Sequence, residues 1–178
     1  MNANLYLSDK EGINMIKPTL YILCGCPGCG KTTWANSFIA SCEIYNIDIR
    51  YVSRDAIRFS TLKDGEDYFA HEDEVFRKFV GTIYHTLVDG FDVIADATHL
   101  NQKSRAKLIR GIDERGKVDY DIIYVSFNIP YEVCKERNAQ RTGRALVPEE
   151  NFEQMYRWYR EPHATEDTRC TAVWEVGE

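Results

Sequence analysis

The stretch that decides the fold runs from residue 20 to residue 32. An apolar run is followed directly by a loop of small residues: Leu20-Tyr21-Ile22-Leu23-Cys24, then Gly25-Cys26-Pro27-Gly28-Cys29-Gly30-Lys31-Thr32. The loop fits the pattern G-x-x-x-x-G-K-[ST] at every fixed position. Small residues let successive backbone N–H groups converge on a phosphate, and the positive end of the following helix points at the same anion. The sequence therefore predicts a buried strand, a phosphate-binding loop and a protein that binds a nucleoside triphosphate.

The loop also predicts individual roles. Lys31 supplies a mobile positive charge for the phosphates, and Thr32 offers a hydroxyl group to Mg²⁺. We expect ATP and Mg²⁺ as the cofactors. The residues expected to contact the nucleotide are Gly25, Pro27, Gly28, Cys29, Gly30, Lys31, Thr32 and Thr33.

Length and composition fit a single domain. The chain has 178 residues, of which 44% are hydrophobic and 12% aromatic, enough for one α/β core. Residues 1–17 are polar without sustained periodicity, so we expect a tail there, with Met15 as an alternative start, and one domain over 18–178. No secretion signal is apparent and no apolar stretch approaches the roughly 20 residues of a membrane span. We therefore expect a soluble, cytoplasmic protein with no membrane partner.

The distribution of charge limits the mode of binding to nucleic acid. The formal net charge is −6, which argues against coating a long nucleic acid through a broad basic face. Basic residues are nevertheless concentrated at Lys135, Arg137, Arg141 and Arg144. Arg137 and Arg141 have helical i, i+4 spacing and would share a face, as in a lid that closes over the triphosphate. The alternative is a basic face that only contacts solvent.

The six cysteines favour a reduced protein over a metal site. Cys24, Cys26 and Cys29 lie close together, but no matching Cys/His quartet occurs elsewhere in the chain. Cys24 ends the buried strand, and the other two occupy loop positions that require small residues. We therefore expect cysteines that fill space in a cytosolic protein.

Strands and helices alternate along the chain. Apolar runs predict strands over 19–24, 48–53, 91–95, 121–127 and 171–176, whereas helical spacing and caps predict helices over 31–40, from 54, over 71–87, 102–115, 131–140 and 148–160. This order indicates an α/β fold of the P-loop kinase type, a three-layer sandwich with a parallel five-stranded sheet and an arginine-bearing lid. Ligands then bind beyond the carboxyl ends of the strands.

The second strand leads into a candidate catalytic pair. Phosphoryl transfer needs an acceptor hydroxyl in line with the γ-phosphate and a carboxylate close enough to take its proton. Asp55 is our choice for that base, although an aspartate at this boundary could instead cap the helix. Arg58 lies three residues on, so a carboxylate and a guanidinium would be presented together to the acceptor.

The third strand ends at Asp96. This carboxylate is expected to reach Mg²⁺ through water, or to orient Arg58 or Thr32. Thr98 and Asn101 are expected either to bind the acceptor or to cap the next helix. Two further groups have structural explanations. The acids at 72–74 suit the first turn of a helix, and the apolar stripe of the last helix suits core packing; the stripe comprises Phe152, Met155, Tyr156 and Tyr159.

The motifs together resemble a known family. They are the loop over 25–34, the pattern R-D-x-x-R at 54–58, R-N-x-x-R at 137–141, Val147-Pro148 and Met155-Tyr156. This combination resembles the kinase domain of phage-type polynucleotide 5′-hydroxyl kinases, within the wider group of small P-loop kinases, over nearly all of 19–161. The resemblance implies transfer of the ATP γ-phosphate to the 5′-OH of RNA or DNA, a step in nucleic acid end repair.

The resemblance also implies roles for individual residues. Asp55 takes the position of the general base, Arg58 that of the acceptor-side arginine and Arg141 that of a lid arginine over the β- and γ-phosphates. Lys31 and Thr32 take the phosphate and magnesium positions. The third-strand sequence Asp96-Ala97-Thr98 is similar to that of the wider kinase group, whereas the phage enzyme places the aspartate next to the threonine.

Two alternatives remain open from the residues. The acceptor could be a nucleoside, an amino sugar or an aminoacylated tRNA, which would leave the phosphoryl-transfer chemistry unchanged. The protein could also be a regulatory ATPase that phosphorylates nothing. A guanine-reading N-K-x-D motif does not occur in the sequence, which disfavours a GTPase.

Overall fold

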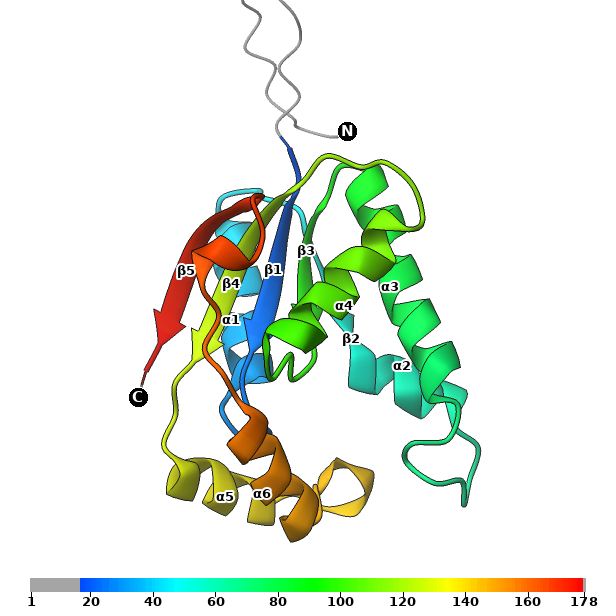
Figure 1. The fold of residues 1–178 in the computed structure, drawn as a ribbon, viewed down its shortest axis with the longest axis vertical. Helices are drawn as coiled ribbons and strands as arrows, with labels where there is room; N and C mark the ends of the chain where they lie inside the picture. The colour runs from blue at the N-terminus through cyan, green and yellow to red at the C-terminus, as the bar shows by residue number, and fades with distance from the viewer. Residues whose placement is uncertain (1–16, 178) are drawn as a thin grey trace, which may run out of the picture.

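The centre of the protein is a sheet of five parallel strands. The structure is a computed structural model and describes residues 17–177. The strand order is β2-β3-β1-β4-β5 (Figure 1), with strands at Thr19–Cys24, Ile49–Ser53, Asp92–Asp96, Asp121–Phe127 and Cys170–Val176 in chain order. The predicted parallel five-stranded sheet is confirmed. The predicted tail, apart from Lys17, and the alternative start at Met15 lie outside the described residues.

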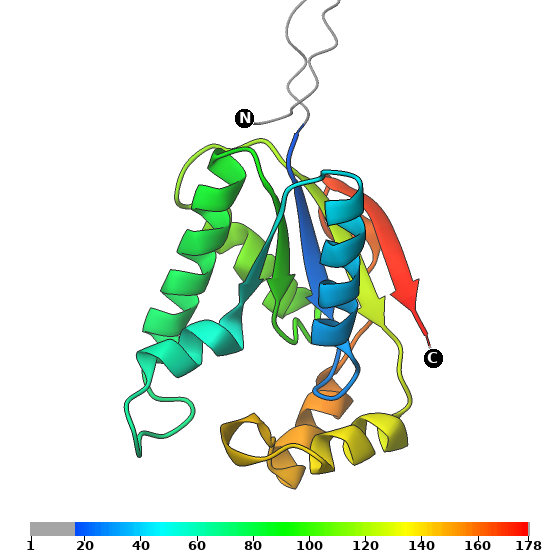
Figure 2. The same cartoon turned by 180° about the vertical axis from the view of Figure 1, so that it is seen from behind.

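Helices cover both faces of this sheet. They span Lys31–Ile44 (α1), Arg54–Thr61 (α2), Glu72–Val88 (α3), Gln102–Asp113 (α4), Tyr131–Ala139 (α5) and Glu149–Trp158 (α6). Figure 1 shows α3 and α4 in front of the sheet, and Figure 2 shows α1 on the opposite face. The three-layer prediction is therefore confirmed.

A hydrophobic core lies on each face of the sheet, and strand β1 contributes side chains to both, which explains its uninterrupted apolar sequence. Leu20 and Ile22 pack on the side of α3 and α4, whereas Tyr21 and Leu23 pack on the side of α1. Successive side chains of a strand point to opposite faces, so a central parallel strand has no face left for solvent.

The carboxyl ends of the strands all point toward one end of the molecule. Helices α5 and α6 lie beyond that end of the sheet, and α2 lies at the same end beside α3 (Figures 1 and 2). The register places Ser53 of β2 opposite Asp96 of β3. Polar residues that follow β1, β2 and β3 are therefore brought to one edge, as the sequence predicted.

Several element boundaries differ from the prediction. Helix α1 continues past residue 40 to Ile44, because the first residue with left-handed backbone after it is Asn46, at φ 54°. Pro148 is the N-cap of α6 and not its first residue. Two short 3₁₀ helices, Gly143–Ala145 (η1) and Ala164–Glu166 (η2), were not predicted. Across residues 17–177, no helix is both long and apolar enough to cross a membrane.

Candidate active site

The loop between β1 and α1 has the tight geometry that its glycines permit. Gly28 and Gly30 have φ of 81° and 97°, in the left-handed region that L side chains rarely adopt. A Cβ on Gly28 would lie 2.4 Å from the carbonyl oxygen of Cys134 in α5, so the loop and α5 pack backbone against backbone. The Gly25 N–H donates to the Thr98 carbonyl at 2.9 Å, which joins the loop to the segment after β3.

Lys31 lies across this loop. Its Nζ donates to the carbonyl oxygens of Gly25 at 2.9 Å and Cys26 at 2.8 Å. The ammonium group therefore stands over the loop backbone, at the place where the pattern requires a cation. A phosphate bound by the loop would exchange these carbonyls for its own oxygens as partners of Lys31.

The cysteines around the loop are buried. Cys24, Cys26 and Cys29 are free thiols within the core. Burial raises the pKa of Cys26 to about 12, so this side chain stays a neutral thiol at physiological pH. Cys29 leaves no room beside Gly25, because a Cβ there would lie 2.6 Å from the Cys29 sulfur. The thiols fill space around the loop, as expected from the sequence.

The predicted magnesium residues are in contact. The Thr32 Oγ1 donates to the Asp96 Oδ2 at 3.2 Å, and the Tyr51 hydroxyl donates to the same oxygen. Burial, followed by the hydrogen bond to Asp96, raises the pKa of Tyr51 to about 12, so this hydroxyl keeps its proton. Asp96 bonds Thr32, whereas Arg58 bonds Asp55 and Glu72, and the role of Asp96 toward Mg²⁺ stays a prediction. A hydroxyl group and a carboxylate are oxygen ligands, which fit Mg²⁺.

Thr98 and Asn101 have structural contacts. The Asn101 side chain accepts the Ser104 N–H at 3.1 Å and forms a capping box at the start of α4. The Thr98 carbonyl holds Gly25, as described above, so the backbone of Thr98 supports the phosphate-binding loop. Its predicted contact with an acceptor stays a prediction.

Asp55 is free of a capping role. The N-cap of α2 is Ser53, whose side chain accepts the Ala56 N–H at 3.3 Å. The Asp55 side chain is 62% exposed, and its Oδ1 accepts from Arg58 Nη1 at 2.6 Å. Arg58 itself is buried, at 5% exposure, so it is not presented freely beside Asp55 as predicted. The buried Arg58 guanidinium instead fixes the orientation of the exposed Asp55 carboxylate through this hydrogen bond.

Sequence reasoning missed the other partners of this pair. The Tyr68 hydroxyl donates to the Asp55 Oδ1 at 2.7 Å, and Arg58 Nη2 donates to the Glu72 Oε2 at 2.6 Å. Arg54 also pairs with Glu72. Glu72 lies in the first turn of α3, as predicted, but its binding of both arginines of α2 was not predicted. The one sequence signal for Glu72 is its place in the acidic run at 72–74, which follows the R-D-x-x-R pattern along the chain.

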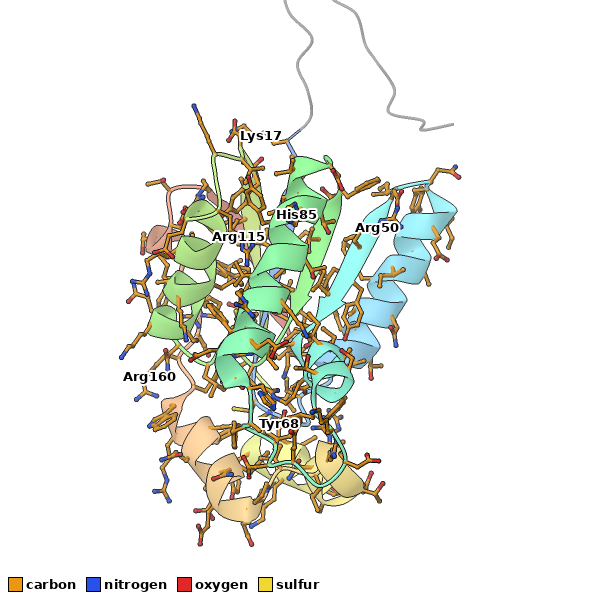
Figure 3. The ribbon with its side chains drawn as sticks, turned by 90° about the vertical axis from the view of Figure 1, so that its right-hand side faces the viewer. Lys17, Arg50, Tyr68, His85, Arg115 and Arg160 are labelled. Carbon is orange, nitrogen blue, oxygen red and sulfur yellow. The ribbon has the colours of Figure 1, made fainter. Side chains whose placement is uncertain are left out.

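Tyr68 lies toward the same end of the molecule as α5 and α6. Figure 3 shows Tyr68 near the lower end, on the side of α5 and α6, while His85 and Lys17 lie toward the other end. The Arg58 guanidinium stacks on the Tyr68 ring at 4.4 Å from its centroid. The loop between α2 and α3 is therefore fixed against α2 by a cation–π contact as well as by hydrogen bonds.

The predicted shared helical face of the lid arginines does not form. Helix α5 ends at Ala139, so Arg137 is helical, whereas Arg141 follows the C-cap and donates weakly to the Ala145 carbonyl at 3.5 Å. Arg144 in η1 donates to the Lys63 carbonyl at 2.9 Å, which connects the lid to the loop before Tyr68. All three arginines are exposed. The lid thus carries cations, but from a turn and not from one helical face.

A buried arginine anchors the chain that follows α6. Arg105 of α4 is fully buried and donates to the carbonyls of His99 and Arg160, each at 3.0 Å. It also pairs with Glu166 at 2.5 Å. These bonds connect the segment after β3 to the chain that leaves α6, so the lid returns to the sheet at a fixed point.

The arrangement as a whole defines a class of protein. The loop after β1, an oxygen pair suited to Mg²⁺ and an exposed carboxylate that accepts two hydrogen bonds lie at the carboxyl edge of a parallel sheet. Exposed arginines lie on α5 and the segment that follows it. This is the organisation of a P-loop domain of the kinase type. The chain belongs to the AAA domain family (AAA_33), whose profile matches residues 20–162.

Known proteins with similar sequences or folds include kinases. The chain is 28% identical over 145 residues to L-seryl-tRNA(Sec) kinase of Methanococcus maripaludis, covering 80% of this chain and 53% of that protein. It also matches a chain of the Pnkp1/Rnl/Hen1 RNA repair complex, with a TM-score of 0.67 and 25% identity over 85% of this chain and 46% of the other. This chain therefore spans about half the length of both proteins.

A fungal RNA kinase has the same fold. The match has a TM-score of 0.62 and 15% identity, and it covers 89% of this chain and 73% of the other. At this identity the match concerns the fold alone. The three proteins confirm the kinase-type P-loop fold, and they differ in what their names say about the acceptor.

Proposed function

We propose that this protein transfers the γ-phosphate of ATP to the 5′-hydroxyl end of RNA or DNA. The observation that carries the proposal is the Asp55 carboxylate. It is 62% exposed, and both Arg58 and Tyr68 bond its Oδ1, which leaves Oδ2 for an incoming hydroxyl group.

The nucleotide side would work through charge. The loop N–H groups and Lys31 would hold the phosphates, and Arg137 and Arg141 would approach from the lid. Thr32 and, through water, Asp96 would hold Mg²⁺, which when bound neutralises charge on the phosphate oxygens. Tyr51 would keep Asp96 turned toward Thr32, because its hydroxyl donates to the same carboxylate oxygen.

The acceptor side would work through a proton. Asp55 would accept the proton of the attacking hydroxyl as the bond to phosphorus forms. Arg58 and Tyr68 fix the direction of the carboxylate, and Glu72 offsets the charge of Arg58, so that the guanidinium is held in place and not drawn toward the phosphates. The name of the RNA repair complex, at 25% identity, supports a nucleic acid end as the acceptor.

The test is transfer of label from γ-labelled ATP to short 5′-OH RNA and DNA oligonucleotides. Asp55→Asn should lower transfer by about 100- to 10,000-fold while leaving ATP affinity nearly unchanged, because a general base acts mainly in the transition state. The matched control is Asp89→Asn, an exposed aspartate at the other end of α3. Full transfer by Asp55→Asn would refute the mechanism, and no labelled oligonucleotide despite ATP binding would refute the acceptor.

A second candidate keeps the chemistry and changes the acceptor to an aminoacylated tRNA. The observation in its favour is the 28% identity to L-seryl-tRNA(Sec) kinase. Competition between a 5′-OH oligonucleotide and a seryl-tRNA for the labelled phosphate separates the two. Release of inorganic phosphate that no acceptor changes would instead favour a regulatory ATPase.

A further inference from the structure

An exposed aromatic cluster lies directly beside the candidate base. It consists of Phe59 on α2 and of Tyr68 and Phe69 on the loop that follows. Phe59 is 38% exposed and Phe69 is 51% exposed, which is unusual for neighbouring phenylalanines on a soluble domain. The Tyr68 ring meets the other two edge to face, with centroids 6.2 Å from Phe59 and 5.0 Å from Phe69.

Tyr68 connects this cluster to the chemistry. Its hydroxyl donates to Asp55 at 2.7 Å, and its ring contacts Phe59 and Phe69. Tyr68 therefore joins the cluster to the carboxylate. In a nucleotide, the 5′-hydroxyl group and the base are separated by a single sugar ring. An acceptor with its hydroxyl at Asp55 would therefore bring its own base to the aromatic cluster.

The loop that carries the cluster holds charges of both signs: Lys63, and the acids at 64, 66 and 67. Lys63 is exposed at the start of the same loop, and its carbonyl accepts the exposed Arg144 of the lid at 2.9 Å. Most nearby acids are already bonded. Glu72 binds Arg54 and Arg58, Glu66 accepts the Lys63 N–H, and the Asp67 side chain accepts the Phe69 N–H, whereas Asp64 is exposed. The aromatic rings thus share their loop with Lys63, and Arg144 bonds that loop. Aromatic rings together with cations can bind a single strand through stacking and phosphate contacts.

We infer that Phe59, Tyr68 and Phe69 form a stacking platform for the terminal base of the acceptor strand. This inference rests on the proposed function and names its substrate class more closely: a single-stranded end that still carries its 5′-terminal base. A neutral sugar or another small acceptor without a base would have no use for the platform.

The test compares two ligands and four proteins. The ligands are a fluorescent 5′-OH single-stranded oligonucleotide and the same oligonucleotide with a 5′-terminal abasic residue, each with a non-hydrolysable ATP analogue. The proteins are wild type, Phe59→Leu, Phe69→Leu and the control Tyr45→Leu, whose ring is 75% exposed beyond the far end of α1. Leucine keeps an apolar side chain, and thermal unfolding checks that each variant folds.

The platform predicts about tenfold tighter binding of the base-bearing end by wild type and by Tyr45→Leu. Phe69→Leu, and to a smaller extent Phe59→Leu, should lose most of that difference while binding the abasic end as wild type does. Equal binding of the two ends by wild type, absence of binding to either, or an unchanged difference in both phenylalanine variants would overturn the inference.

Phosphoryl transfer to the same two ligands separates this inference from the proposed function. Base-dependent binding without any transfer would remove the kinase assignment and keep the platform. Transfer at equal efficiency to both ends, with equal binding, would keep the kinase assignment and remove the platform.

Discussion

The phosphate-binding loop and the surroundings of Asp55 are assembled in different ways. In the loop, the groups that would meet phosphate come from eight consecutive residues, and glycines at φ 81° and 97° give the backbone its shape. Around Asp55, side chains come from α2, the following loop and α3, and they meet through Arg58, Tyr68 and Glu72. The shape of the phosphate-binding loop therefore depends on consecutive residues, whereas the arrangement around Asp55 depends on packing between separate segments. Substitutions in the two regions should consequently fail in different ways.

Within the phosphate-binding loop, the largest effect on transfer should come from Lys31→Met. Removal of the ammonium group that bonds the loop carbonyls should lower phosphoryl transfer by about 100- to 1,000-fold and should also weaken ATP binding. Asp55→Asn, by contrast, should spare ATP binding. Paired measurements of ATP affinity and transfer test this split, with the exposed Lys117→Met as the control. Equal ATP affinity for wild type and Lys31→Met would contradict the division of the site.

Next comes a pair of glycine substitutions in the loop. In Gly28→Ala, the new Cβ meets the Cys134 carbonyl at 2.4 Å in addition to an unfavourable φ, so unfolding free energy should fall by about 3 kcal/mol. In Gly30→Ala, no heavy atom lies within 4 Å of the Cβ, and about 1 kcal/mol is expected from the backbone alone. Denaturant unfolding compares them. Equal losses would mean that contact with α5 does not shape the loop.

The support behind the loop should respond to pH. His99 is buried, bonds the Leu23 carbonyl at 2.9 Å, and burial lowers its pKa to about 3. Since the unfolded chain binds a proton near pH 6.5 and the folded chain does not, stability is complete above pH 6.5 and falls as the pH drops toward 3.

The slope should approach about 1.4 kcal/mol per pH unit from this group. His99→Asn tests it, because asparagine tolerates the left-handed backbone at φ 40°. Urea unfolding of both proteins between pH 7 and pH 4 should give a flatter dependence for the variant. Parallel curves would exclude His99 as the source.

The smallest effect should come from Tyr68→Phe. It removes one of two hydrogen bonds to the Asp55 Oδ1 and leaves Arg58 in place. Because Asp55 is exposed, kcat should fall only about five- to tenfold, with little change in the KM for ATP. Tyr45→Phe is the matched control at an exposed tyrosine. A wild-type kcat for Tyr68→Phe would mean that Arg58 alone orients the carboxylate.

Local patterns in the sequence were sufficient for the architecture. The alternation of apolar runs with helical segments predicted every strand of the sheet to within one residue at each end, because buried parallel strands must be apolar along their length. The contact between Thr32 and Asp96 also followed from their places after β1 and β3, which are neighbours in the sheet. Helix ends were less accurate, since caps such as Ser53 and Pro148 compete with propensity at each boundary.

The acceptor side was only partly predictable. Asp55 and Arg58 followed from one helix turn, but the burial of Arg58 and its bond to Glu72 depend on α3 packing against α2. Tyr68 lies in a polar loop with no periodic pattern, so no signal marked it. Arg137 and Arg141 were expected to share a helical face from their spacing, but α5 ends at Ala139, before Arg141.

The sequence by itself determined the parallel sheet, the phosphate-binding loop and the order in which candidate groups follow the strands. These features depend on backbone conformation and on side-chain periodicity, which a few consecutive residues specify. Only the tertiary structure decided which charges are paired, which oxygen of Asp55 is held and which aromatic rings lie beside it. The hydrogen bonds and ion pairs of Tyr68 and Glu72 join residues 13 to 18 positions apart, and their energies depend on burial and distance, which no local pattern records.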